Sequence, residues 1–210
     1  MYSLERKSSA APEPQLVPIV PSQSLEWLWQ LLKEERYPAV LDCGPIRAST
    51  FALLMARRAR LYAGDILRPL LESDPELWDR TRKEPVFRAA RLLEGLPPVP
   101  PESLSLILAW NVFDLIPPQA VPAIFGHLLG CLKPQGLMFL MLREPSRTAG
   151  VETRIWLEQL TALRTEPDAT RTFSYPPVSN RQIENLAQGC SVKIFLTRNG
   201  RREIAVLRQR

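Results

Sequence analysis

Four residues combine chemistry that suits ligand binding with a position just after a short apolar segment. They are two carboxylates, one glycine and one amide: Asp42, Asp65, Gly44 and Asn111. If those apolar segments are parallel strands of one sheet, their carboxyl ends meet at the edge where open α/β sheets bind ligands. Carboxylate and amide groups at that edge could hydrogen-bond a polar ligand, and a glycine would let the backbone approach it closely.

Other reactive side chains are weaker candidates. His127, the one histidine, falls on the polar side of the apolar face over residues 121–132, which indicates a solvated helix residue. The three cysteines show no C-x-x-C spacing, so neither a disulfide framework nor a zinc site is indicated. Asp114, which follows Asn111 closely, could contact a ligand, and it could equally be a polar residue of the loop. The sequence therefore assigns no catalytic residue and no metal site.

Hydrophobic periodicity predicts the elements that must position the four candidates. Short, mostly apolar segments indicate buried strands, which we expect over residues 39–41, 60–63, 104–110 and 137–142. Apolar residues at i, i+3 and i+4 indicate helices, which we expect from Ser24 to near Tyr37, from Ser49 onward, over 67–77 more weakly, over 121–132 and over 151–164. Ser179 and Gln182 form a capping box that starts a further helix, and Gly189 ends it.

The order of these elements predicts the fold class. Residues 192–197 and 203–207 flank Asn199-Gly200, a strong signal for a type I′ hairpin. Alternating strands and helices then predict an α/β fold: a Rossmann-like, mostly parallel sheet with an antiparallel C-terminal hairpin strand and helices on both faces. At 210 residues, of which 45% are hydrophobic, one domain is expected. We expect residues 1–21 to be a flexible, Pro-rich tail and residues 22–210 to form the domain.

Composition disfavours two classes of partner. The net charge of +5 comes from 27 basic and 22 acidic residues, which are scattered except at Arg57, Arg58 and Arg60, so a nucleic-acid partner is not favoured. No apolar run is long enough for a membrane span, and the first twenty residues lack the apolar core of a signal peptide. We therefore expect a cytoplasmic protein that does not bind a membrane.

Four stretches together resemble the class I S-adenosylmethionine-dependent methyltransferases. They are VLDCGPIRA at 40–48, similar to the family's first motif, LYAGDI at 61–66, EGLPPVPPESLSLILAWNVFDLIPP at 94–118, and LLGCLKPQGLMFL at 128–140 with its LKPGG-like turn. Asp65 follows Asp42 by 23 residues, close to the roughly 20 that separate a first βα turn from an acidic ribose acceptor. The resemblance covers about residues 25–208.

The resemblance implies S-adenosylmethionine as the cofactor. It places Gly44 beside the methionine portion and Asp65 at the ribose hydroxyls, with Asp42 and Asn111 as further cofactor contacts. The chain departs from the family pattern at four positions: Ile46 and Ala48 replace the two later glycines of the first motif, and Leu92 and Ser105 stand where acids are common. Three alternatives stay open: Gly44 is a simple turn glycine, Asp65 caps the next helix, and Asn111 and Asp114 are polar residues of the loop that leaves the strand.

These observations lead to three functional hypotheses. The first is methyl transfer from S-adenosylmethionine to an unidentified small-molecule or protein acceptor, with acceptor contacts expected within residues 145–176. The second is a non-catalytic interaction or scaffolding protein, which the altered first motif would permit. The third, a dinucleotide-dependent oxidoreductase, is disfavoured because the sequence lacks G-x-G-x-x-G.

Overall fold

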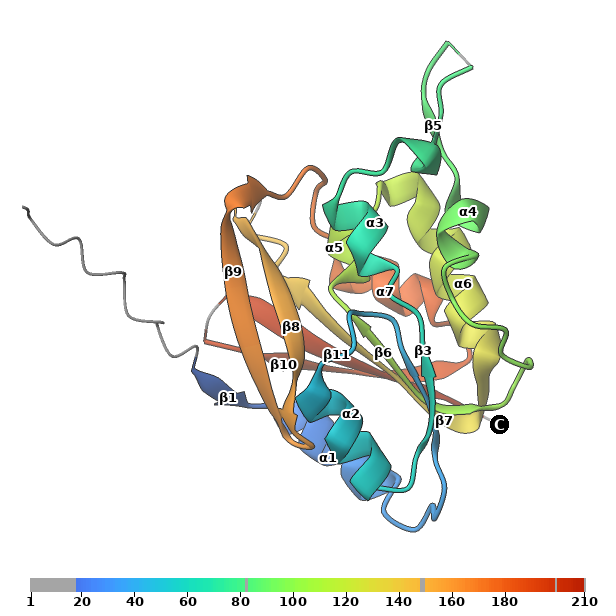
Figure 1. Ribbon diagram of the computed structural model, residues 1–210, viewed down its shortest axis with the longest axis vertical. Coiled ribbons are helices and arrows are strands. Elements are labelled where there is room, and N and C mark those ends of the chain that lie inside the picture. The colour runs from blue at the N-terminus through green and yellow to red at the C-terminus, as the bar shows by residue number, and fades with distance from the viewer. Residues whose placement is uncertain (1–17, 82, 148–149, 199, 210) are drawn as a thin grey trace, which may run out of the picture.

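A six-stranded sheet forms the centre of the structure, a computed structural model that describes residues 18–81, 83–147, 150–198 and 200–209 (Figure 1). Its strands lie in the order β10-β11-β7-β6-β2-β3. The bounds are Ala39–Asp42 for β2, Arg60–Ala63 for β3, Leu104–Trp110 for β6, Leu132–Arg143 for β7, Cys190–Leu196 for β10 and Arg201–Arg208 for β11. β2, β3, β6 and β7 are parallel, whereas β11 is antiparallel to β7 and to β10. The predicted mostly parallel sheet with an antiparallel terminal hairpin is confirmed.

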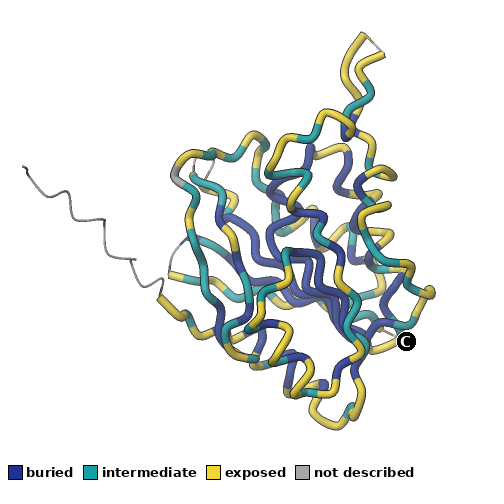
Figure 2. Tube along the Cα trace, in the orientation of Figure 1, coloured by how far each residue is buried: buried dark blue, intermediate teal, exposed yellow. Residues whose placement is uncertain are grey.

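Helices cover both faces of this sheet. They are α1 (Gln23–Leu31), α2 (Ala48–Ala56), α3 (Leu67–Leu71), α4 (Ala89–Leu93), α5 (Val112–Leu115), α6 (Val121–Cys131) and α7 (Asn180–Leu186), with 3-10 turns at Pro75–Leu77 and Pro118–Ala120 and a small hairpin of β4 (Trp78–Asp79) and β5 (Val86–Phe87). Figure 1 shows α1 and α2 on one side of the sheet and α6 and α7 on the other. Because the sheet is covered on both faces, every residue of β6 is buried, and the buried trace in Figure 2 runs through the central strands.

A second sheet corrects one prediction. It contains β1 (Ile19–Pro21), β8 (Val151–Gln159) and β9 (Ala162–Thr172), all antiparallel, in the order β1-β9-β8. The helix that we predicted over residues 151–164 is therefore wrong. Thr153, Ile155 and Leu157 are buried while Arg154 is exposed, so the governing period is two rather than 3.6.

The N-terminal end of the described chain joins this second sheet. Ile19–Pro21, which we expected within the flexible tail, pairs with β9. Residues 1–17 of the expected tail lie outside the described residues. The side chain of Ser22 caps α1 by accepting the N–H of Leu25. Helix α1 thus starts one residue earlier than the Ser24 start that we predicted, and it ends at Leu31 rather than near Tyr37.

Several local predictions are confirmed. β3 and β6 have the predicted bounds, and Ser179 and Gln182 form the predicted capping box at the start of α7. The hairpin of β10 and β11 is present; Gly200 in its turn has a φ of 73°, while Asn199 lies outside the described residues. Among the described residues, no helix combines the length and apolar character needed to cross a membrane.

Candidate functional site

The strand order predicts a ligand crevice at the carboxyl ends of β2 and β6. From β2 the chain passes to β3 on one side, and from β3 it passes to β6 on the other side of β2. Open α/β sheets bind ligands where the strand order reverses in this way. Asp42 ends β2 and Asn111 follows β6, so the sheet brings two of the four predicted residues to this crevice.

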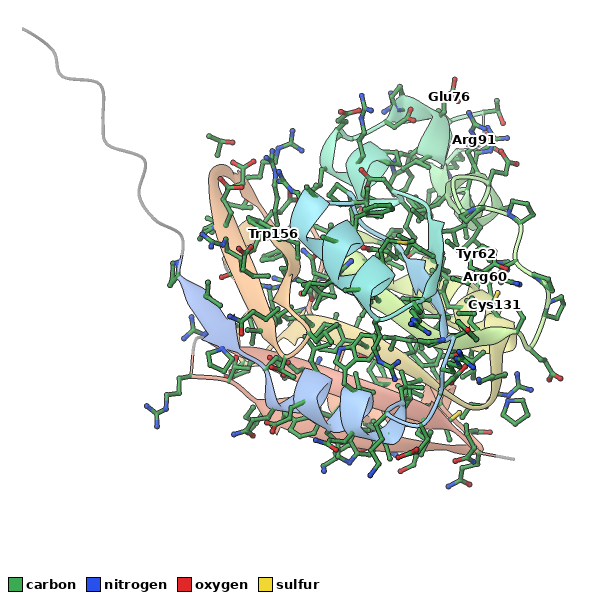
Figure 3. The ribbon with its side chains drawn as sticks, turned by 60° about the horizontal axis from the view of Figure 1, so that its bottom comes forward. Arg60, Tyr62, Glu76, Arg91, Cys131 and Trp156 are labelled. Carbon is green, nitrogen blue, oxygen red and sulfur yellow. The ribbon has the colours of Figure 1, made fainter. Side chains whose placement is uncertain are left out.

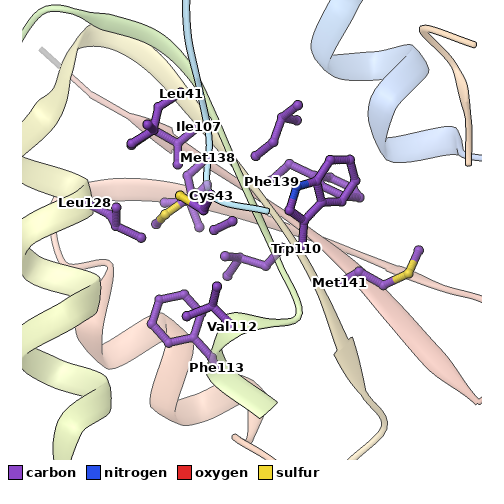
Figure 4. Packing of buried hydrophobic residues seen from close by; sticks show 14 of the residues in the cluster. Leu41, Cys43, Ile107, Trp110, Val112, Phe113, Leu128, Met138, Phe139 and Met141 are labelled. Atoms are coloured by element: carbon purple, nitrogen blue, oxygen red, sulfur yellow. The ribbon is translucent and has the colours of Figure 1, made fainter. Parts of the chain in front are cut away.

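The indole of Trp110 fills the crevice above the turn that follows β2. Its Nε1 donates a hydrogen bond to Asp42 Oδ1 at 2.6 Å, and the same oxygen accepts the N–H of Gly44 at 3.0 Å. A Cβ on Gly44 would lie 2.8 Å from Trp110 Cδ1, closer than side-chain atoms pack. Trp110 also meets Phe139 edge to face, with ring centroids 5.8 Å apart, and Figure 4 shows the two side chains together in the core. Gly44 is thus required because the indole rests on it.

This arrangement shields the Asp42 side chain from solvent. The residue is 1% exposed, and burial raises the pKa of its carboxyl to about 6, although the hydrogen bonds from Trp110 and Gly44 oppose the rise. Because the side chain is almost fully covered, a ligand in the crevice could contact this carboxylate only if the groups that cover it moved. Asp42 therefore orients the indole in this conformation.

The edge strand β8 closes the crevice from outside. Asn111 is buried, and its Nδ2 donates to the carbonyl oxygen of Thr153 in β8 at 3.1 Å. Asn111 Oδ1 is buried without a hydrogen-bond partner among the described residues. The Asn111 amide thus connects the end of β6 to the second sheet through its nitrogen, while its oxygen accepts no hydrogen bond from the described residues.

The first turn of helix α2 is hydrogen-bonded to the same strand, β8. Ser49 Oγ and Thr50 Oγ1 both donate to the carbonyl oxygen of Leu157, at 2.9 and 3.2 Å. The N-cap of α2 is Arg47 and the helix begins at Ala48, one residue before Ser49, where we expected the helix to start. The Arg47 guanidinium stacks 4.8 Å from the ring centroid of Trp156, which Figure 3 shows on the hairpin beside α2.

A cavity of about 210 Å³ remains between the central sheet and the β8–β9 hairpin. Its lining combines apolar, acidic and basic side chains from both parts: Pro45, Arg47, Asp65, Arg68, Leu71, Glu72, Glu152, Thr153, Arg154, Asp168 and Arg171. Of the four predicted site residues, only Asp65 lines this cavity. Asp42, Gly44 and Asn111 are buried beneath Trp110 and β8 instead.

Asp65 caps a helix and faces the cavity at the same time. Its Oδ1 accepts the N–H of Arg68 at 3.0 Å, in the first turn of α3, as the alternative reading of the sequence expected. Burial is the main cause that raises the pKa of its carboxyl. A carboxylate offers about four acceptor positions, so the cap leaves capacity for a ligand hydroxyl.

Two further polar residues named from the sequence have structural partners. Asp114 is fully buried, and its Oδ2 accepts the backbone N–H of Arg143 at 2.9 Å beside an ion pair at 3.4 Å. Ser105 lies at the opposite end of β6, where its Oγ donates to Glu35 at 2.5 Å. His127 is exposed on α6, as predicted.

The cavity fits one end of S-adenosylmethionine better than the other. A ribose could place its hydroxyls on Asp65 within the cavity. The methionine end, which the family resemblance places over Gly44, has no space there while Trp110 occupies that position. In this conformation the described residues would thus offer an acceptor to the nucleoside end of S-adenosylmethionine, and no space to its methionine end until the indole moves.

Comparison with known proteins identifies the fold. No protein-family model matches the chain, and no curated protein matches it in sequence. A solved S-adenosylmethionine-dependent methyltransferase from Mesorhizobium loti is similar in structure, with 12% identity, a TM-score of 0.51 and coverage of 88% of this chain and 98% of that chain. Another, from Archaeoglobus fulgidus, has 12% identity, a TM-score of 0.51 and coverage of 88% and 91%. At this level of identity, the likeness concerns the fold.

Proposed function

We propose that this chain, which has the fold of the class I S-adenosylmethionine-dependent methyltransferases, binds S-adenosylmethionine beside Asp65 and transfers its methyl group to an acceptor. The observation that carries the proposal is the cavity at the carboxyl end of β3. The half-buried carboxylate of Asp65 and the side chain of Pro45, in the turn after β2, both line this cavity. A ligand crevice at this edge is what the sheet topology favours.

Each part of the cavity has a distinct role in this proposal. Asp65 accepts the ribose hydroxyls, and the apolar side chains of Pro45 and Leu71 offer surface to the nucleoside. When bound, the cofactor supplies a methyl group on a positively charged sulfur. The chain contributes positioning, since holding two reactants in line provides much of the rate in such transfers.

In this proposal the methyl acceptor binds at the opposite wall of the same cavity. Glu152, Thr153 and Arg154 of β8, with Asp168 and Arg171 of β9, line that wall. All of them fall within residues 145–176, where the sequence led us to expect acceptor contacts. Their mixed charges suit a polar acceptor, which could be a small molecule or a protein side chain.

Trp110 supports a second candidate function. Its indole rests on Gly44 and its Nε1 bonds Asp42, while the Asn111 amide is committed to Thr153. In this alternative the chain keeps the fold as a non-catalytic interaction or scaffolding module. The two candidates differ in whether S-adenosylmethionine binds.

Isothermal titration with S-adenosylmethionine distinguishes them. We expect micromolar binding to the wild-type chain, weakened by about tenfold or more in Asp65→Asn, because the amide keeps the helix cap but loses the charge that strengthens bonds to the ribose hydroxyls. Asp74→Asn is the matched control, since Asp74 caps the next 3-10 turn outside the cavity. Absence of binding at millimolar cofactor would overturn the proposal and favour the non-catalytic candidate.

A further inference from the structure

We infer that Trp110 determines which part of an adenosyl ligand the crevice admits: the nucleoside enters beside Asp65, and the indole excludes the group attached to the ribose 5′ carbon. The inference deepens the proposed function and rests on it. It makes Trp110 the specificity-determining residue of the site, and it predicts a ligand preference that the intact chain should display.

The indole lies against the turn that would hold the 5′ substituent of a bound nucleoside. In open α/β sheets that bind nucleotides, the acid after the second strand receives the ribose, and the group beyond the ribose lies against the first strand-to-helix turn. In this chain the acid is Asp65 and the turn runs from Asp42 to Pro45. Trp110 Cδ1 and Nε1 lie 2.8 and 3.0 Å from the Cβ position of Gly44. The path of the 5′ substituent is therefore closed where the indole touches the turn.

The indole is fixed in that position. Trp110 is 1% exposed, bonds Asp42 at 2.6 Å and contacts Phe139 edge to face. Asn111, the next residue, is tied to Thr153 of β8. A ligand thus cannot displace the indole as it would a mobile surface side chain; it must supply the free energy that breaks these contacts.

The backbone at the same residue is strained. Trp110 has a φ of 48°, in the left-handed region that non-glycine residues rarely occupy. Such strain persists only where surrounding contacts maintain it, and it concentrates at ligand sites. A change of backbone conformation at residue 110 would relieve this strain and take the indole off Gly44. Methyl transfer requires this movement, because the methionine end of the cofactor would lie over Gly44. Nucleoside binding beside Asp65 does not require it.

A comparison of two ligands tests the inference on the unmodified protein. Adenosine carries only the nucleoside, whereas S-adenosylhomocysteine adds the amino-acid tail on the 5′ carbon. With Trp110 over Gly44, we expect titration calorimetry to give dissociation constants within about threefold of each other. Tighter binding of S-adenosylhomocysteine by about tenfold or more would overturn the inference and leave the proposed function intact, because the tail would then be held.

Two variants at Trp110 provide a second test of the inference. Trp110→Gly removes the indole and suits the left-handed backbone, so it should tighten S-adenosylhomocysteine by about tenfold while adenosine changes less than about threefold. Trp110→Phe keeps a ring over Gly44 and is the matched control, which should retain the wild-type ratio of the two constants. Equal effects of Trp110→Gly on both ligands would contradict the inference. If neither ligand binds the wild-type chain or Trp110→Gly, the proposed function and the inference fail together.

Discussion

The replacement Asp42→Asn should make the folded chain more stable, and increasingly so as the pH rises. Asp42 lies beneath the indole of Trp110, 1% exposed, and burial raises the pKa of its carboxyl from 3.8 to about 6. Asparagine keeps the Oδ1 acceptor that bonds Trp110 and Gly44, but it carries no charge at any pH. The variant therefore changes the ionisation of the buried group and leaves its neighbours in place.

The expected magnitude follows from linkage. Because the folded-state pKa lies above the unfolded value, the folded state binds the proton more tightly, and the contribution of Asp42 to stability is lost as the pH rises from about 4 through about 6. Each unit of pKa corresponds to about 1.4 kcal/mol, so the full loss is about 3 kcal/mol. The variant should exceed the wild type by less than about 1 kcal/mol at pH 4 and by about 3 kcal/mol at pH 8.

Urea unfolding followed by far-ultraviolet circular dichroism between pH 4 and pH 8 measures this difference. Since other carboxyl groups titrate alike in both proteins, the change in the difference with pH isolates Asp42. A difference that does not vary with pH would refute the reasoning, because Asp42 would then be exposed to water and Trp110 would not seal the crevice. Trp110→Phe serves as a cross-check: it removes a hydrogen bond that lowers the pKa of Asp42, so it should move the titration upward.

Three other predictions concern contacts around the same fold. Asp114→Ala leaves the buried Arg143 guanidinium without its carboxylate and should cost about 3–5 kcal/mol in urea unfolding; a loss below about 1 kcal/mol would show that the pair is not buried. Glu203→Ala removes the acceptor of two serine hydroxyls at the start of α1, at 2.8 and 2.6 Å, so amide hydrogen exchange in α1 should accelerate; unchanged exchange would contradict this. Gly44→Ala should cost about 1–3 kcal/mol by overpacking against Trp110, and in a double-mutant cycle Trp110→Gly should remove most of that cost.

The parts of the fold that sequence reasoning could predict are those that local chemistry determines. The apolar segment Leu104–Trp110 indicates a strand buried on both faces, and Ser179 with Gln182 indicates the start of a helix; the structure has both. The hairpin of β8 and β9 was missed because a helical period and a period of two both fit residues 151–164. The alternation of Thr153, Ile155 and Leu157 was the available signal, but no glycine or asparagine marks the turn that follows.

The site could be located from the sequence more easily than it could be described. Asp42, Gly44 and Asn111 do meet at one edge of the sheet, because parallel strands bring their carboxyl ends together. Their contacts depend on residues distant in sequence: Trp110 reaches Asp42 across 68 positions, and Asn111 reaches β8 across 42. No periodicity encodes such pairs. Asp65 differs from these three residues, because its bond to Arg68 is local in sequence and its place after β3 brings it to the cavity.

A crystal structure of the complex with S-adenosylhomocysteine would show where the ribose and the homocysteine tail bind. We expect the ribose hydroxyls within hydrogen-bond distance of the Asp65 carboxylate. We also expect the Trp110 indole to be displaced from Gly44 in every molecule whose homocysteine tail is ordered over the turn after β2. An adenosyl group bound away from Asp65, or a tail ordered beside Gly44 with the indole still bonded to Asp42, would contradict these expectations.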